Sequence, residues 1–258
     1  MKTTFSLHAV RAAFLVTSAL ALAVPVVHAQ TATALTSQTA TTAVKLPPAY
    51  TLHYSTKGKA KGINYSANSV LTWAPNGSSY RASVKTTMVP LGSRTQSSEG
   101  AITAQGLKPQ RMIDRWVRGK TTQMSGNTIK FQDEYRPQVS MLPGAQDQVS
   151  LAIQASGWIT ANPSAFTPGK RVALQVVGFN HAPVWQFNVG QPQSLTINGN
   201  TYTAVYMRQA AQAGQTKTTE VWFVPATIKG QATYIPARIR VTSTEGEYVE
   251  QLAKALPG

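Results

Sequence analysis

Few residues of this sequence have the chemistry of a catalytic or metal site, and their spacing suits neither. After residue 29 the only histidines are His53 and His181, which fall in different predicted strands with no carboxylate at ligand spacing, so no metal site is predicted. There is no cysteine, which excludes disulfides, thiolate metal sites and a thiol nucleophile. Motifs of serine hydrolases, phosphate loops and zinc proteases are missing. We expect a protein that is not an enzyme and uses no cofactor.

Two of the nine acidic residues stand in apolar surroundings and are the candidate functional acids. Asp147 precedes an apolar run and is expected to cap a helix. Glu220 is expected to form a structural ion pair across strands with Arg238 or Arg240, and a role as a catalytic acid is the alternative.

The first 29 residues have the layout of a secretory signal peptide. Lys2 and Arg11 precede an apolar stretch over 12–27, and the small residue Ala29 suits a signal-peptidase site. A membrane anchor is the alternative, but the stretch is shorter than the about 20 residues that span a bilayer. We expect an exported periplasmic protein that is not transmembrane after cleavage and that, without cysteine, is not a lipoprotein.

Composition divides the remaining chain into a leader, a domain and a tail. Residues 30–46 are mostly Thr, Ala, Ser and Gln, which predicts a disordered leader. Residues 47–253 have the length of one β-rich domain, and 254–258 form a short C-terminal tail.

Alternation of apolar and polar residues dominates the domain and predicts strands. Residues 65–73 and 80–88 alternate on either side of a Pro-Asn-Gly turn at 75–77, as in an antiparallel hairpin. Similar patterns predict ten to twelve strands in a large curved antiparallel sheet, a half-barrel or open barrel. The lysines at 57, 59 and 61 alternate as on one side of an edge strand.

One segment has helical character instead. From Asp147 to Ile159 the apolar residues occupy most of a helix circumference, so this helix requires burial on more than one side. A concave sheet wrapped around one central helix would supply that burial. The helix is expected to end at Asn162-Pro163.

Aromatic residues are the best candidates for a binding site. Core packing accounts for most of them individually, but together they could line an apolar cavity between sheet and helix. The candidates are Trp73, Trp158, Trp185, Trp222 and Phe223.

The chain is strongly basic, with 24 Lys and Arg against 9 Asp and Glu and a net charge of +15. Export argues against nucleic acid as a partner. An anionic envelope surface or an envelope protein is the more plausible partner.

Several stretches resemble a known family of exported proteobacterial proteins, the domain of unknown function 3108 family. They are LHYSTKGKAKGINYSANSVLTW (52–73), LGSRTQSSEGAITAQGLKPQR (91–111), LPGAQDQVSLAIQ (142–154), EVWFVPA (220–226) and YIPARIRVTSTEGEYVEQ (234–251). The resemblance implies an exported β-rich protein and supplies no catalytic residues. Val221-Trp222, Pro225, Pro236 and Arg238-Ile239 are also similar to the ending of periplasmic lipoprotein carriers, half-open barrels with a cavity for acyl chains.

Three functions are compatible with these features. The first is a periplasmic binding or carrier protein for an apolar or lipid-like ligand, held between sheet and helix. The second is a structural or protein-interaction module of the cell envelope. The third is a hydrolase of envelope polymers that uses Glu220 or Asp147.

Overall fold

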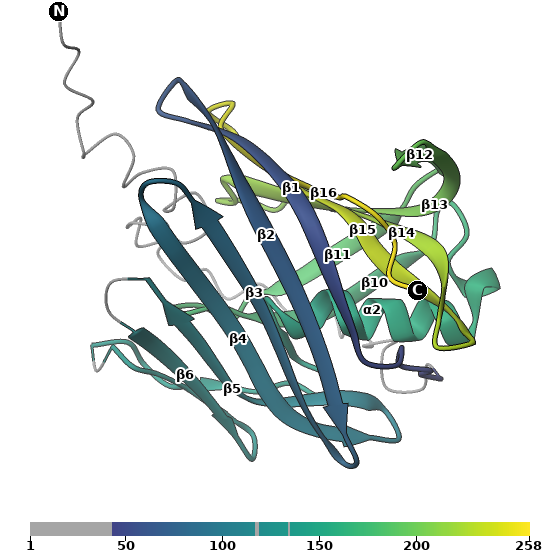
Figure 1. Ribbon diagram of the computed structural model, residues 1–258. Coiled ribbons are helices and arrows are strands. Elements are labelled where there is room, and N and C mark those ends of the chain that lie inside the picture. Colours follow the sequence, from purple (N-terminus) through teal and green to yellow (C-terminus); the bar gives the residue numbers. More distant parts are fainter. Residues whose placement is uncertain (1–42, 117–118, 134) are drawn as a thin grey trace, which may run out of the picture.

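The computed structural model describes residues 43–116, 119–133 and 135–258, and in this part of the chain sixteen strands form one large sheet with a helix against it (Figure 1). The first half contains β1 (Tyr50–Ala60), β2 (Ile63–Asn76), β3 (Ser79–Met88), β4 (Gly92–Thr103), β5 (Gly106–Arg115), β6 (Gly119–Ser125), β7 (Thr128–Phe131), β8 (Val139–Ser140) and β9 (Gln146–Asp147). The helix α2 (Ser150–Ala161) and the 3-10 turn η2 (Pro163–Ala165) follow. The second half contains β10 (Arg171–Val177), β11 (Val184–Val189), β12 (Gln193–Ile197), β13 (Asn200–Gln209), β14 (Lys217–Ile228), β15 (Gln231–Ser243) and β16 (Tyr248–Ala253).

The sheet is open, and β1 and β16, the first and last strands of the described chain, pair with each other near its centre. Strands β1 to β8 pair in chain order, each antiparallel to the next. Strand β16 pairs with β1, and the order continues through β15, β14, β13, β11 and β10 to β9, with β12 paired to β13. Since β8 and β9 end this path, the sheet is a half-barrel, as predicted, and not a closed barrel.

The predicted hairpin is confirmed in detail. Strands β2 and β3 pair antiparallel, with Trp73 opposite Ala82 and Asn76 opposite Ser79 across the turn. Strand β1 alternates buried and exposed residues along its whole length. The expected ten to twelve strands were too few, because β7, β8, β9 and β12 have five residues or fewer, which is too short for alternation to identify a strand from sequence.

Helix α2 is buried on most of its surface, as predicted. Residues 153–159 are all buried. Ile153 belongs to an apolar cluster with β1, β2 and β15, whereas Trp158 and Ile159 belong to a second cluster with β10, β11 and β14. The helix is therefore the shared wall of two cores inside the curved sheet.

The last residues of the predicted leader contact the helix. Residues 43–46 were expected within a disordered leader, but Lys45 donates its backbone N–H to the Gly157 carbonyl at 3.0 Å. A Cβ at Gly157 would lie 2.8 Å from Val44 and 3.0 Å from Leu46, so the glycine lets this segment approach the helix closely. The predicted signal peptide and residues 30–42 lie outside the described residues.

Strand β1 is central, which corrects the expectation of an edge strand. Lys57 pairs with Ser66 of β2 on one side and with Glu250 of β16 on the other. At the end of β16, the N–H of Lys254 bonds to the His53 carbonyl at 2.8 Å, so the short tail starts attached to β1.

Candidate ligand-binding cavity

A cavity of about 430 Å³ lies between the concave side of the sheet and helix α2. Its walls come from strands far apart in sequence, including β2, β3, β10, β11, β14 and β15. Most of the lining is apolar, with Leu71 and Val84 on one wall, Leu151 on the helix, and Phe187 and Ile239 on the other. This volume lies within the range of ligand pockets in proteins, about 300–1,000 Å³.

Three of the five predicted aromatic residues line this cavity. Trp158 reaches it from α2, Trp185 from β11 and Phe223 from β14. The helix and the two strands meet there because all three contribute to one apolar cluster. The aromatic composition therefore located part of the cavity wall correctly.

Trp73 and Trp222 do not line the cavity, which corrects the prediction. Trp73 packs in the apolar core near Tyr80, with ring centroids 5.6 Å apart, and its indole N–H donates to the Pro47 carbonyl at 2.9 Å. Both tryptophans belong to the solid cluster that contains Ile153. Their role is packing, because a buried indole N–H with a protein acceptor needs no ligand.

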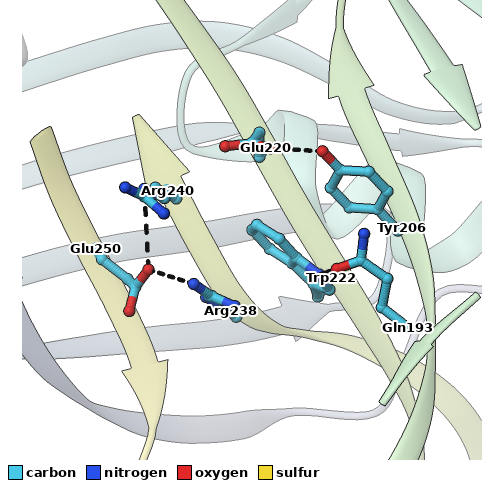
Figure 2. Close-up of polar contacts among 7 residues, drawn as sticks. All are labelled: Gln193, Tyr206, Glu220, Trp222, Arg238, Arg240 and Glu250. Carbon is cyan, nitrogen blue, oxygen red and sulfur yellow. Dashed lines mark hydrogen bonds and ion pairs between the residues drawn. The ribbon is translucent and has the colours of Figure 1, made fainter. Parts of the chain in front are cut away.

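The surroundings of Trp222 are polar on one side (Figure 2). Its indole N–H donates to Gln193 at 2.7 Å, and the Arg238 guanidinium lies 4.3 Å from the ring centroid. The Tyr206 ring lies on it at a centroid distance of 4.9 Å. The side chain is thus held between a cation and a second aromatic ring, away from the cavity.

The ion pair expected for Glu220 forms with a different acid. Arg238 pairs with Glu250 at 2.5 Å and Arg240 approaches the same carboxylate at 4.0 Å (Figure 2). Register places Glu220 opposite Arg240, but Glu250 is opposite Arg240 on the other side. Glu220 instead accepts a hydrogen bond from the Tyr206 hydroxyl at 2.5 Å. Arg240 thus has an acidic residue opposite it on each neighbouring strand, and it forms its ion pair with Glu250.

Asp147 binds the start of the helix and lies away from solvent. Its Oδ1 accepts the backbone N–H groups of Val149 at 2.9 Å and Ser150 at 2.8 Å, and the Ser98 hydroxyl donates to Oδ2 at 2.5 Å. Asp147 thus satisfies the first amides of α2, as expected, although it lies three residues before the helix and Val149 holds the N-cap position. Burial raises the pKa of Asp147, and its hydrogen bonds only partly oppose this shift.

The ionisable side chains at the cavity include bases but no acid. Of the described residues that line it, Arg94, His181 and Lys217 are basic and none is Asp or Glu. Sequence reasoning missed this set because the three residues lie in separate strands and loops. Only the curvature of the sheet brings them to one cavity.

Arg94 is fixed at the cavity wall by a buried ion pair. It lies on β4 and donates to both carboxylate oxygens of Asp114 on β5, from Nε at 2.8 Å and from Nη2 at 2.5 Å. The two side chains are only 6% and 11% exposed. The fork geometry holds the guanidinium in one orientation.

Burial at the cavity lowers the pKa values of Lys217 and His181. Burial lowers the pKa of Lys217; Glu247 raises it in opposition, and the positive charge of Arg94 lowers it further. Burial also lowers the pKa of His181, with smaller contributions from Arg136 and Lys217. Because the pKa of His181 lies below its ordinary value of 6.5, the imidazole is neutral at pH 7.

The described residues contain no group of three or more His, Asp or Glu side chains placed to hold a metal ion. In the same residues, no helix combines the length and apolar character needed to cross a membrane.

The comparisons with known proteins identify the fold. A solved structure, a β-barrel-like protein of domain of unknown function DUF1849 from Brucella abortus, is similar with a TM-score of 0.54 and 10% sequence identity. The match covers 83% of this chain and 98% of that chain. No family model and no curated protein matches the sequence, so the resemblance to the domain of unknown function 3108 family is not confirmed. The chain is thus similar to a β-barrel-like protein in fold alone.

Proposed function

We propose that this protein is a non-catalytic binding or carrier protein of the periplasm that holds an apolar, lipid-like ligand between its half-barrel and helix α2. The cavity carries the proposal: it is about 430 Å³ in volume, mostly apolar, and bounded by Trp158, Trp185 and Phe223. Burying an alkyl chain there contributes about 0.8 kcal/mol per methylene group. The predicted signal peptide supports the periplasmic location.

The architecture of the sheet supports the presence of an open cavity. The sheet path ends at β8 on one side and at β9 on the other, so the half-barrel is not closed. A space of about 430 Å³ is large for the inside of a fold, because protein interiors have few voids larger than a water molecule.

A cavity-filling substitution tests the proposal. Ala152 lies on α2 and lines the cavity, so Ala152→Trp should occupy the space that the ligand needs. Ala161→Trp, at the end of the same helix, is the matched control because Ala161 is not part of the cavity lining. We expect dodecanol to bind the wild type and Ala161→Trp in calorimetric titration, and to bind Ala152→Trp at least about tenfold more weakly.

Two results would contradict the proposal. One is equal binding of dodecanol to both variants, which would place the site elsewhere. The other is no binding to the ligand-stripped wild type. Circular dichroism of each variant shows whether the fold is retained.

A further inference from the structure

Large hydrophobic side chains are exposed mainly at one end of the sheet. Among the described residues, those exposed are Ile63, Val89, Tyr135 and Leu142. Ile63 begins β2 directly after the β1–β2 turn, and Val89, 86% exposed, lies in the turn between β3 and β4. Both turns lie on the upper left side of Figure 1.

Tyr135, which is 90% exposed, lies at the same end. It follows β7, where Gln132 donates its backbone N–H to the Thr121 carbonyl at 3.0 Å, near the start of β6. Strand β6 starts opposite Arg115, the last residue of β5, and Arg115 also pairs with Thr95 near the start of β4. Single exposed apolar residues are normal on a surface, but three of the four described ones share this end of the sheet.

The turns of the second half of the sheet reach this end as well. The Thr216 carbonyl, in the β13–β14 turn, accepts the N–H of Thr244 in the β15–β16 turn at 2.8 Å. Glu247, in the same β15–β16 turn, accepts the backbone N–H of Lys61 in the β1–β2 turn at 2.7 Å. The ends of both halves of the sheet are thus adjacent.

The cavity opens at this end. Its lining includes Gln212 and Ala213 of the β13–β14 turn, and both are exposed. Tyr65 and Met88, close to the turns that contain Ile63 and Val89, also line it. The exposed apolar side chains therefore lie beside the mouth of the cavity.

The charged side chains at this end are more often basic than acidic. Outside the buried pair of Arg94 and Asp114, the exposed bases among its described residues are Lys59, Lys61, Arg115, Lys120 and Arg136, and the acids are Asp133, Glu245 and Glu247. The pair of Arg136 with Asp133, at 3.7 Å, leaves the remaining bases in excess. Exposed apolar groups beside basic residues complement an anionic lipid surface.

We propose that this end of the sheet docks on an anionic bilayer, with Ile63, Val89 and Tyr135 at the level of the head groups. The three side chains project from separate turns, which suits a fluid lipid surface, whereas a protein partner needs about 1,000 Å² of continuous complementary contact. Tyrosine is also enriched at membrane–water interfaces. Docking directs the cavity mouth at the bilayer, so that an apolar ligand passes between them; only this last step rests on the proposed function.

Labelling at single cysteines tests which end enters the bilayer. The chain has no cysteine, so Val89→Cys and Tyr135→Cys each accept one molecule of the environment-sensitive dye acrylodan. We expect the emission of both to shift to shorter wavelengths with vesicles of phosphatidylglycerol and phosphatidylethanolamine, and to stay unchanged with vesicles of phosphatidylcholine. Leu142→Cys is the matched control and should show no shift. Leu142 is as exposed as Ile63, at 45%, but follows a residue bonded to the β6–β7 turn, at the opposite end.

Cosedimentation with the same anionic vesicles measures the apolar contribution. Ile63→Ser combined with Val89→Ser should lower the affinity of the mature protein at least about tenfold, because two exposed apolar side chains no longer leave water. Leu142→Ser should bind as the wild type does. Circular dichroism shows whether each variant retains its fold.

A second pair of variants tests the charges. Arg115→Gln combined with Lys120→Gln should weaken binding to the anionic vesicles and reduce its dependence on salt. Lys108→Gln combined with Lys130→Gln removes two exposed charges nearer the opposite end and should bind as the wild type does. Equal weakening by both pairs would show an effect of net charge and would overturn the proposed orientation.

Three further results would overturn the docking. They are no binding of the wild type to anionic vesicles, an equal emission shift of the dye at residue 142, and unchanged vesicle binding of the Ile63 and Val89 variant. The first would favour a protein partner at this end. None of them involves dodecanol binding in solution, so they leave the test of the proposed function separate.

Discussion

The buried ion pair at the cavity wall gives a quantitative test of how this site is built. Arg94 and Asp114 make two hydrogen bonds, at 2.8 and 2.5 Å, with side chains 6% and 11% exposed. Removing one partner of such a pair leaves a buried charge uncompensated and costs about 3–5 kcal/mol. We therefore expect Arg94→Met to lower the free energy of unfolding by that amount.

Two further variants separate the pair from its surroundings. Arg94→Met combined with Asp114→Leu removes both charges and should recover most of the loss, because a buried ion pair can often be replaced by apolar residues at little cost. Arg81→Met breaks a surface pair in which Arg81 lies 3.9 Å from Glu99 and is 85% exposed. This control should cost less than about 1 kcal/mol.

Urea unfolding followed by tryptophan fluorescence measures these three variants and the single variant Asp114→Leu. The reasoning fails if Arg94→Met destabilises no more than Arg81→Met. It also fails if the double variant is as unstable as the sum of its single changes, since the two side chains would then be energetically independent.

Three other predictions concern the helix and the outer face of the sheet. Gly157→Val should displace the segment at Val44, because a Cβ would lie 2.8 Å from it, and should cost about 1–3 kcal/mol of unfolding free energy; a stability equal to wild type would show that the segment is not packed there. Burial raises the pKa of Asp147, so the folded state binds more protons than the unfolded state. The stability from this group is complete below its unfolded pKa near 3.8 and is lost as the pH rises through the folded pKa. Asp147→Asn should therefore flatten the dependence of the unfolding free energy on pH over that range, and an unchanged dependence in urea unfolding would contradict this. Glu250→Gln loses the ion pair with an arginine and should lower the unfolding free energy by about 1 kcal/mol more than Glu220→Gln, which keeps its hydrogen bond to tyrosine; equal effects would refute the assignment of the pair.

Local patterns made the elements predictable. The alternation over residues 65–88 depends only on which side chains face the core, and the hairpin of β2 and β3 follows from it directly. The apolar circumference of residues 147–159 likewise required a helix buried on several sides, which is what α2 is.

Pairing between distant segments could not be read from such patterns. The lysines of β1 are typical of an edge strand, yet β16, almost 200 residues later, covers that edge. Nothing local distinguishes an edge strand from one whose partner lies at the other end of the chain.

The candidate site was predictable only in part, for the same reason. Trp158, Trp185 and Phe223 reach the cavity, whereas Trp222 is covered by Arg238 and Gln193 on another side of the sheet. The residue type is the same in both places, so the sequence alone does not distinguish a tryptophan that lines the cavity from one that packs elsewhere. Arg94 and Lys217 line the same cavity from strands that are far apart in the sheet order, and no sequence pattern indicates this.

Native mass spectrometry of the mature protein, purified from periplasm without detergent, tests the central claim most directly. Extraction under denaturing conditions then identifies whatever is released. We predict one bound apolar, lipid-like molecule with an aliphatic chain per protein molecule. A mass equal to that of the polypeptide alone, together with no uptake of added dodecanol, would contradict a ligand-binding function.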